Sequence, residues 1–136
     1  MTHRSRSFDD NRPIDLICMG RVAVDLYAEQ VNSNLKNAQS FRKYLGGCAG
    51  NTAVGTARLG LKSAMFSCVG TDEMGLFLRN TLESEGVDTT LLRSTTGHLT
   101  ALVVLGVNPP DRFPLIFYRE NCADMQIQPE DANPEM

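Results

Sequence analysis

Apolar and polar positions occur in blocks along the first part of the chain. Residues 14–19 form a short, nearly continuous apolar run that ends before Gly20, which is typical of a strand buried on both faces of a parallel sheet. Residues 22–27 alternate more and are rich in strand-forming side chains. A polar segment, 32–37, interrupts the pattern before it returns at 41–45. These blocks predict strands on both sides of a polar excursion.

Small residues dominate the segment that follows Gly46, Gly47 and Gly50. Residues 51–59 are compatible with a slim helix that can lie close to a sheet, and Gly60 is placed to end it in a left-handed conformation. The apolar block 64–69 predicts a second buried strand. Thr71 or Asp72 can then cap another helix. The apolar stripe of that helix consists of Met74, Phe77, Leu78 and Leu82. We interpret this stripe as core and Asp72 as a helix cap.

The later part of the chain has a different pattern. Residues 99–107 and 115–118 predict two strands, and the turn-rich link 108–111 between them is of hairpin type. Residues 127–136 are polar, contain two prolines and provide no closing element. The order strand, glycine loop, helix, strand, helix predicts an α/β fold with an insertion. So few strands leave a sheet edge unpaired, and we expect an interrupted domain.

Composition and charge exclude several classes of protein. The 136 residues carry a net charge of −3, without the basic face that a nucleic-acid-binding protein needs. No apolar run has the length of a membrane span, and residues 1–13 lack the apolar stretch of a signal peptide. The four cysteines include no C-x-x-C pair, which argues against zinc or redox chemistry. We expect a cytoplasmic protein with a disordered leader at 1–13 and no nucleic-acid or membrane partner.

The pair Gly46-Gly47, followed by Asn51 at the head of a helix, is the most informative feature. Paired glycines let a backbone approach a ligand closely, and a helix start offers free amide donors. The segment is not a P-loop, because no Gly-Lys-Ser/Thr follows. A nicotinamide-dependent oxidoreductase is disfavoured by the glycine spacing. Taken alone, such a pair is more often simple turn chemistry.

The context of the glycine pair adds specificity. The motifs are Gly46-Gly47-x-x-Gly50-Asn51-x-Ala53, Arg58-Leu59-Gly60 and Val69-Gly70-x-Asp72-x-x-Gly75. Together they resemble the first signature of the ribokinase-like (phosphofructokinase B) family of carbohydrate kinases. The resemblance implies that residues 14–136 form the N-terminal part of a ribokinase-like domain. It further implies a central, mostly parallel sheet with flanking helices and a small β-sheet lid, with lid strands at about 22–45 and 99–119.

In that family the sugar lies between the sheet and the lid. The resemblance implies that Asp25, in Gly20-x-x-x-x-Asp25, binds sugar hydroxyls, and that Gly46, Gly47 and Asn51 hold the sugar from the other side. This is chemically reasonable, because a carboxylate accepts from two hydroxyls while an amide both donates and accepts. Without the motif, Asp25 would be interpreted as a solvated acid at a strand end.

The sequence around the second predicted lid strand indicates a class of substrate. Residues 117–124, Phe-Tyr-Arg-Glu-Asn-Cys-Ala-Asp, resemble that strand in kinases of keto-deoxy sugar acids. Strand alternation puts Phe117 and Arg119 on one face, and the resemblance implies that Arg119 binds the substrate carboxylate with Phe117 beside it. The alternative is a solvated arginine, or one paired with Glu120 or Asp124.

The family's second signature, Asp-Thr-x-Gly-Ala-Gly-Asp, is absent from the sequence. In the family it supplies the general base and the helix-start amides that stabilise the transferred phosphoryl group. We therefore expect no catalytic, cofactor-binding or metal-binding residue in this chain, and ATP with Mg only in a full-length parent. The chain alone is expected to be an inactive, truncated sugar-binding half. A non-catalytic sugar-binding module and a dimerisation fragment stay open, and a homo-oligomer through the lid or the truncated edge is expected.

Overall fold

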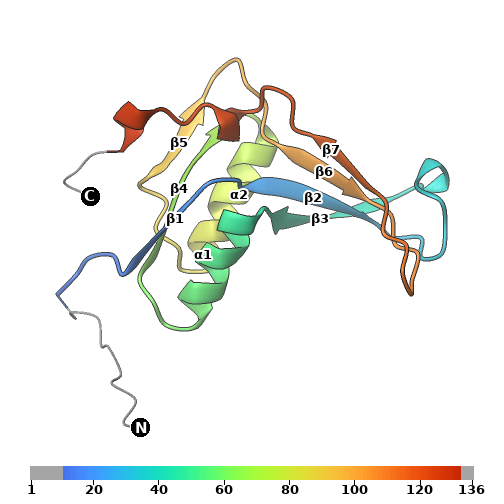
Figure 1. Cartoon of the computed structure of the whole chain (residues 1–136), viewed down its shortest axis with the longest axis horizontal. Helices are drawn as coiled ribbons and strands as arrows, with labels where there is room; N and C mark the ends of the chain where they lie inside the picture. Colours follow the sequence, from blue (N-terminus) through green and yellow to red (C-terminus); the bar gives the residue numbers. More distant parts are fainter. Residues whose placement is uncertain (1–10, 133–136) are drawn as a thin grey trace, which may run out of the picture.

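The computed structural model describes residues 11–132, so the leader expected at 1–13 falls for the most part outside the described residues. Within this range the chain forms two sheets and two α-helices (Figure 1). The first sheet is parallel, with the strand order β1-β4-β5. These strands and the two helices form what we call the body. Its elements are β1 (Leu16–Met19), β4 (Ser63–Gly70), β5 (Leu92–Thr95), α1 (Cys48–Arg58) and α2 (Glu73–Ser84).

The second sheet, which we call the lid sheet, has the strand order β3-β2-β6-β7. It extends to one side of the body, to the right in Figure 1. The central strands β2 and β6 are parallel, and β3 and β7 flank them in antiparallel orientation. The strands are β2 (Ala23–Ala28), β3 (Phe41–Gly46), β6 (Leu102–Leu105) and β7 (Leu115–Tyr118). The predicted α/β fold with a mostly parallel sheet, flanking helices and a small additional β-sheet is therefore confirmed.

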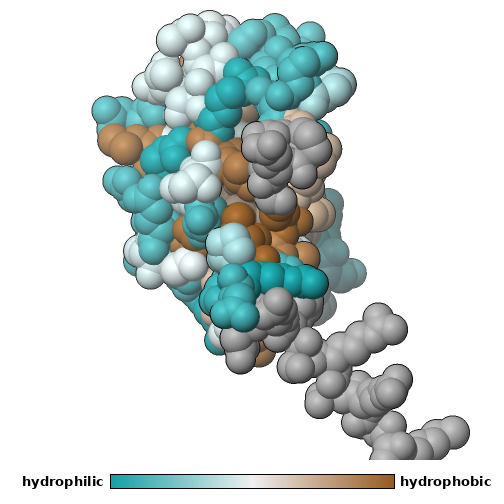
Figure 2. Space-filling model, turned by 90° about the vertical axis from the view of Figure 1, so that its left-hand side faces the viewer, coloured by the Kyte–Doolittle hydropathy of each residue, from teal (hydrophilic) through white to brown (hydrophobic). Residues whose placement is uncertain are grey.

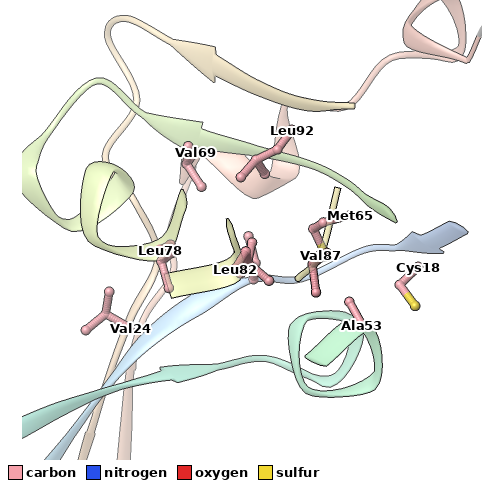
Figure 3. Packing of buried hydrophobic residues seen from close by; sticks show 10 residues of the cluster. Cys18, Val24, Ala53, Met65, Val69, Leu78, Leu82, Val87 and Leu92 are labelled. Carbon is pink, nitrogen blue, oxygen red and sulfur yellow. The ribbon is translucent and has the colours of Figure 1, made fainter. Parts of the chain in front are cut away.

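The core lies between the helices and the sheets. Helix α2 contributes the fully buried Leu78 and Leu82, as its apolar stripe predicted. In Figure 3, Leu78 lies between Val24 of β2 and Val69 of β4, so that α2 joins the two sheets. Helix α1 needs its small residues because Ala53 is fully buried against the body sheet. Burial of each large aliphatic side chain contributes about 1.5–3 kcal/mol to stability.

The prediction of a strand buried on both faces is correct for β4 and wrong for β1. Every residue of β4 is buried. In β1, Cys18 is buried in the core, whereas Ile17 and Met19, on the opposite face, are 38% and 65% exposed. Figure 2 views the molecule from the end where the body sheet lies and shows apolar surface gathered at the centre between hydrophilic margins. An apolar run in the sequence does not specify how many of its faces are covered.

Two other boundaries differ from the sequence-based prediction. Strand β5 was not predicted, because Leu92-Arg93-Ser94-Thr95 holds a single apolar residue and gains its strand conformation by pairing with β4. The helix predicted over 51–59 begins earlier than expected, since α1 starts at Cys48 with Gly47 as its N-cap. Gly60 follows the helix with φ of +92°, as expected for a left-handed cap. Among residues 11–132 no helix is long and apolar enough to cross a membrane.

Candidate functional site

The predicted site residues on β2 and β3 lie on one face of the lid sheet. Strand register puts Asp25 between Tyr44 of β3 and Val103 of β6, and Val103 in turn lies opposite Phe117 of β7. Directly paired residues point to the same face, so these four side chains form a row across the sheet. Val24, next to Asp25, points instead into the core. The alternation of β2 thus separates a binding face from a packing face.

A cavity of about 390 Å³ opens on the binding face beside helix α1. It is lined by Asp25, Tyr27, Tyr44, Leu45 and Asn51. The two tyrosine rings meet edge to face with 5.3 Å between their centroids. The structure therefore brings Asp25 and Asn51 together, although they are separated by an excursion and a strand in the sequence. Aromatic rings beside a carboxylate and an amide form a polar cavity with flat apolar walls.

Gly46 is required by its contact with Asp25. A Cβ atom at position 46 would lie 2.2 Å from Cγ and from Oδ2 of Asp25. Real Cβ atoms do not approach other heavy atoms so closely, so any side chain here would displace the carboxylate. The backbone of Gly46 is buried and therefore forms part of the floor beneath Asp25.

Gly47 connects the lid sheet to helix α1. Its φ of +91° is a conformation that L side chains rarely adopt, and a Cβ atom would lie 2.5 Å from the carbonyl oxygen of Arg21. That oxygen accepts a hydrogen bond from the amide of Gly50 at 3.3 Å, and the amide of Asn51 donates to Gly47 at 2.9 Å. These contacts hold the start of α1 against the beginning of β2. Gly46 and Asn51 thus adjoin Asp25, and Gly47 follows directly in the turn.

The electrostatics of Asp25 suit a ligand-binding acceptor. Burial raises the pKa of Asp25 above its ordinary value, and the positive charge of Arg21 lowers it in part. Within residues 11–132 the carboxylate of Asp25 takes part in none of the hydrogen bonds or ion pairs. A partly desolvated acceptor without a protein partner gains most from donors that a ligand brings.

Phe117 and Arg119 differ in how they relate to this cavity. Phe117 lies on the binding face, and the guanidinium carbon of Arg21 is 5.5 Å from the centroid of its ring. Arg119 pairs with buried Asp124: Nε and Nη2 lie 2.8 and 2.7 Å from Oδ2. Neither Phe117 nor Arg119 lines the cavity that holds Asp25. The structure thus realises the Asp124 pairing that the sequence left open for Arg119.

Asp72 caps helix α2, as predicted. Its carboxylate accepts hydrogen bonds from the amides of Met74 and Gly75 at 3.0 and 2.9 Å and from Thr100 at 2.8 Å. Burial alone would raise the pKa of Asp72, but these hydrogen bonds and one from the Thr100 hydroxyl together lower it. Unlike Asp25, this carboxylate is already satisfied by the protein.

A larger cavity, about 820 Å³, lies between the first turn of α2 and residues 118–122. It is mostly apolar, and none of the predicted sugar-binding residues lines it. Among residues 11–132 no group of three or more His, Cys, Asp and Glu side chains could hold a metal ion. The smaller cavity is the better candidate because it combines a desolvated carboxylate with an exposed amide.

Sequence reasoning missed three residues of this region. Tyr27 was detectable, because it follows Asp25 by two positions and so shares its face. Tyr44 could be placed only once the register of β2 and β3 was known. Arg21 gave no signal beyond its position after Gly20, and its proximity to Asp25 and Phe117 arises from the pairing of β2, β6 and β7.

Comparison with known proteins gives consistent results. Residues 14–135 match the model of the pfkB family carbohydrate kinases. The 5-dehydro-2-deoxygluconokinase of Geobacillus kaustophilus is 34% identical over 127 residues, which cover 93% of this chain and 38% of that enzyme. The enzyme of the same name from Clostridium tetani is 36% identical with the same coverage. The chain thus spans 38% of the length of these curated relatives.

Solved structures also show this similarity. A PfkB protein of Polaromonas sp. JS666 matches with a TM-score of 0.83 and 30% identity, over 88% of this chain and 40% of that one. An uncharacterized sugar kinase of Pyrococcus horikoshii, solved in complex with ATP, matches with a TM-score of 0.81 and 29% identity, over 88% and 39%. The arrangement of body and lid sheet is therefore shared with sugar kinases.

Proposed function

Because this chain belongs to the pfkB family of carbohydrate kinases, we propose that it forms the sugar-binding part of an ATP-dependent kinase for a keto-deoxy sugar acid. The substrate is of the 5-dehydro-2-deoxygluconate type. Support for this class comes from curated relatives named 5-dehydro-2-deoxygluconokinase, which match over 93% of the chain. The observation that carries the proposal is the unpartnered Asp25 carboxylate above Gly46, with Asn51 in the same cavity.

Each residue of the site has a defined role in this proposal. Asp25 accepts hydrogen bonds from two sugar hydroxyls, and Asn51 donates to one oxygen and accepts from another. Gly46 and Gly47 are proposed to bring main-chain groups to the sugar, and their missing side chains make room for the Asp25 carboxylate and for the backbone of Arg21. Phe117, with its ring on the same face, packs beside the substrate. These contacts bind and orient the sugar, which is the first requirement of phosphoryl transfer.

ATP with Mg supplies the phosphoryl group when it is bound. Its binding residues and the general base are proposed to lie in the part of the relatives that this chain does not span, because the family's second signature is absent from the sequence. The 136 residues alone are then expected to bind sugar without phosphorylating it. ATP-dependent turnover by this chain alone would contradict that expectation.

Arg119 is the proposed partner of the substrate carboxylate. Asp124 holds one edge of its guanidinium, and the remaining N–H groups can still donate to a ligand. The substitution Arg119→Ala in the full-length enzyme should remove the contact between the guanidinium and the substrate carboxylate, which is worth about 1.5–3 kcal/mol. We therefore expect kcat/KM on the sugar acid to fall by about ten- to a hundredfold, with little change on a neutral analogue.

Arg112, exposed in the turn between β6 and β7, is a suitable control for this experiment. Arg112→Ala should leave kcat/KM unchanged on both substrates. Equal losses on both substrates in Arg119→Ala would mean that Arg119, through Asp124, stabilises the structure and does not read the carboxylate.

The lid sheet is also proposed to mediate association of the chain with a second copy. Its strands expose several large apolar side chains on both faces. The exposed fractions are 39% for Phe41, 49% for Leu115, 45% for Ile116, 53% for Phe117 and 57% for Tyr118. Exposed apolar side chains that lie close together are typical of interaction sites.

A further inference from the structure

Arg21 lies beside the candidate site, yet none of the roles described above uses its side chain. It immediately precedes the fully buried Val22 and is itself half-buried. Its backbone is fixed, because its carbonyl accepts a hydrogen bond from Gly50 and lies close to Gly47. The direction of the Arg21 side chain is therefore set by the same contacts that fix the glycine turn.

The guanidinium of Arg21 extends over the binding face. Its central carbon lies 5.5 Å from the centroid of the Phe117 ring, a distance at which a cation and an aromatic face attract each other. The charge of Arg21 also acts on Asp25, whose pKa it lowers in part against the effect of burial. Arg21 thus stands between the two ends of the row that runs from Asp25 to Phe117.

The donors of Arg21 are unused. Within residues 11–132, ion pairs engage Arg42, Arg58, Arg93 and Arg119, and Arg21 takes part in none of them. No hydrogen bond in this range uses its guanidinium either. By contrast, Nε and Nη2 of Arg119 already donate to Asp124. A half-buried guanidinium with five free N–H donors, held against an aromatic ring, is preorganised for a planar anion.

We infer that Arg21 is a specificity-determining residue that binds the carboxylate of the sugar-acid substrate, in addition to Arg119. The inference rests on the proposed function, since it concerns the same site and substrate class. Phe117 holds the guanidinium plane from one side, and the amides at the start of α1 add positive potential nearby. A neutral sugar offers no group that uses a guanidinium fork as well as a carboxylate does.

The test compares variants of the full-length enzyme on the sugar acid and on its neutral analogue, in which a hydroxymethyl group replaces the carboxylate. We expect Arg21→Ala to lower kcat/KM on the acid by about ten- to a hundredfold, mainly through KM, and to change the neutral analogue by less than about threefold. Arg21→Lys keeps the charge without the fork and should restore part of the loss. Arg112→Ala, in the exposed turn between β6 and β7, is the control and should affect neither substrate.

Equal losses on acid and neutral analogue would overturn the inference, because Arg21 would then only support the glycine turn. An unchanged kcat/KM on the acid would overturn it as well. If Arg21→Ala does not fold, Arg21→Gln provides the same comparison with a side chain that keeps the aliphatic packing. If kcat/KM of the wild-type enzyme is no higher on the acid than on the neutral analogue, the proposed substrate class is refuted. That outcome is visible without any variant, so it is distinguishable from a failure of the inference about Arg21.

Discussion

Strands β4 and β7 are both built largely from apolar residues, but their surroundings are opposite. All residues of β4, Ser63–Gly70, are buried, whereas all residues of β7, Leu115–Tyr118, are exposed. Strand β4 lies in the middle of the body sheet and contacts both helices. Strand β7 is the edge of the lid sheet and has a neighbour on one side only within residues 11–132. Apolar side chains therefore stabilise the fold in β4, while in β7 they are available for a ligand or a partner.

The largest expected difference is in the cost of truncating an apolar side chain in each region. Leu78→Ala removes a fully buried side chain between the two sheets and should lower the free energy of unfolding by about 2–5 kcal/mol. Ile116→Ala, in β7, removes a side chain that is 45% exposed and should cost less than about 1 kcal/mol. Urea unfolding of both variants measures the difference. Similar costs would mean that β7 packs as tightly as the core.

Gly47, the N-cap of α1, lies where the lid sheet joins the body, whereas Gly55 lies within α1 in the body. The cost of adding a side chain at each position tests how strained that junction is. Gly47→Ala forces a side chain into a left-handed backbone 2.5 Å from the Arg21 carbonyl, and should destabilise the protein by about 1–3 kcal/mol. Gly55→Ala places its Cβ in open space within the same helix and should be neutral or stabilise by up to about 1 kcal/mol. Thermal unfolding of the pair separates a strained junction from ordinary helix propensity.

The two aspartates should respond to mutation with opposite signs. Asp72→Ala loses the cap of α2 and should cost about 1–2 kcal/mol near neutral pH, whereas Asp25→Asn should leave stability unchanged or slightly raised while substrate binding is lost. The pKa of Asp72 is lowered in the folded state, so its contribution is present above the unfolded pKa of about 3.9 and is lost as pH falls through the folded pKa. The pKa of Asp25 is raised, so its contribution is present below the unfolded pKa and is lost as pH rises through the folded pKa.

Unfolding measured between about pH 3 and pH 7 tests these signs. In Asp72→Ala the free energy of unfolding should fall less on acidification than in the wild type. In Asp25→Asn it should no longer show the small decrease expected as pH rises toward 7. A loss of stability in Asp25→Asn comparable with that in Asp72→Ala would show that Asp25 is a structural residue.

The smallest expected effect concerns association. Tyr118→Lys places a charge on the exposed β7 and should weaken self-association of the protein by about fivefold or more, which corresponds to about 1 kcal/mol. Leu59→Lys, at a body position that is 84% exposed, is the control and should have no effect. Sedimentation across the micromolar range measures both. A wild-type protein that stays monomeric throughout would refute association through the lid sheet.

Sequence patterns predicted the elements whose residues carry their own signal. The stripe of α2, its cap at Asp72 and the buried β4 depend on local periodicity and end in the predicted places to within a few residues. Strand β5 has no such signal, because its conformation comes from pairing with β4. The exposure of Ile17 and Met19 depends on what covers the sheet, which periodicity does not encode.

The candidate site shows the same division. Asp25, Gly46, Gly47 and Asn51 were predicted from sequence motifs, and in the structure Gly46 and Asn51 adjoin Asp25. Arg21 and Tyr44 join them only through the register of β2 with its neighbours. The ion pair of Arg119 with Asp124 was one of several arrangements that the sequence allowed, and only the position of the 119–124 loop distinguishes among them.

The contact between Gly46 and Asp25 also limits how this protein can evolve. A methyl group at position 46 would occupy the space of the carboxylate at position 25, so position 46 cannot gain a side chain while Asp25 keeps its place. A larger residue at 46 is therefore expected only after Asp25 has changed, and under the proposed function that change removes the acceptor for the sugar. Position 25 can vary alone, whereas a side chain at 46 would mark a lineage that has already lost this acceptor.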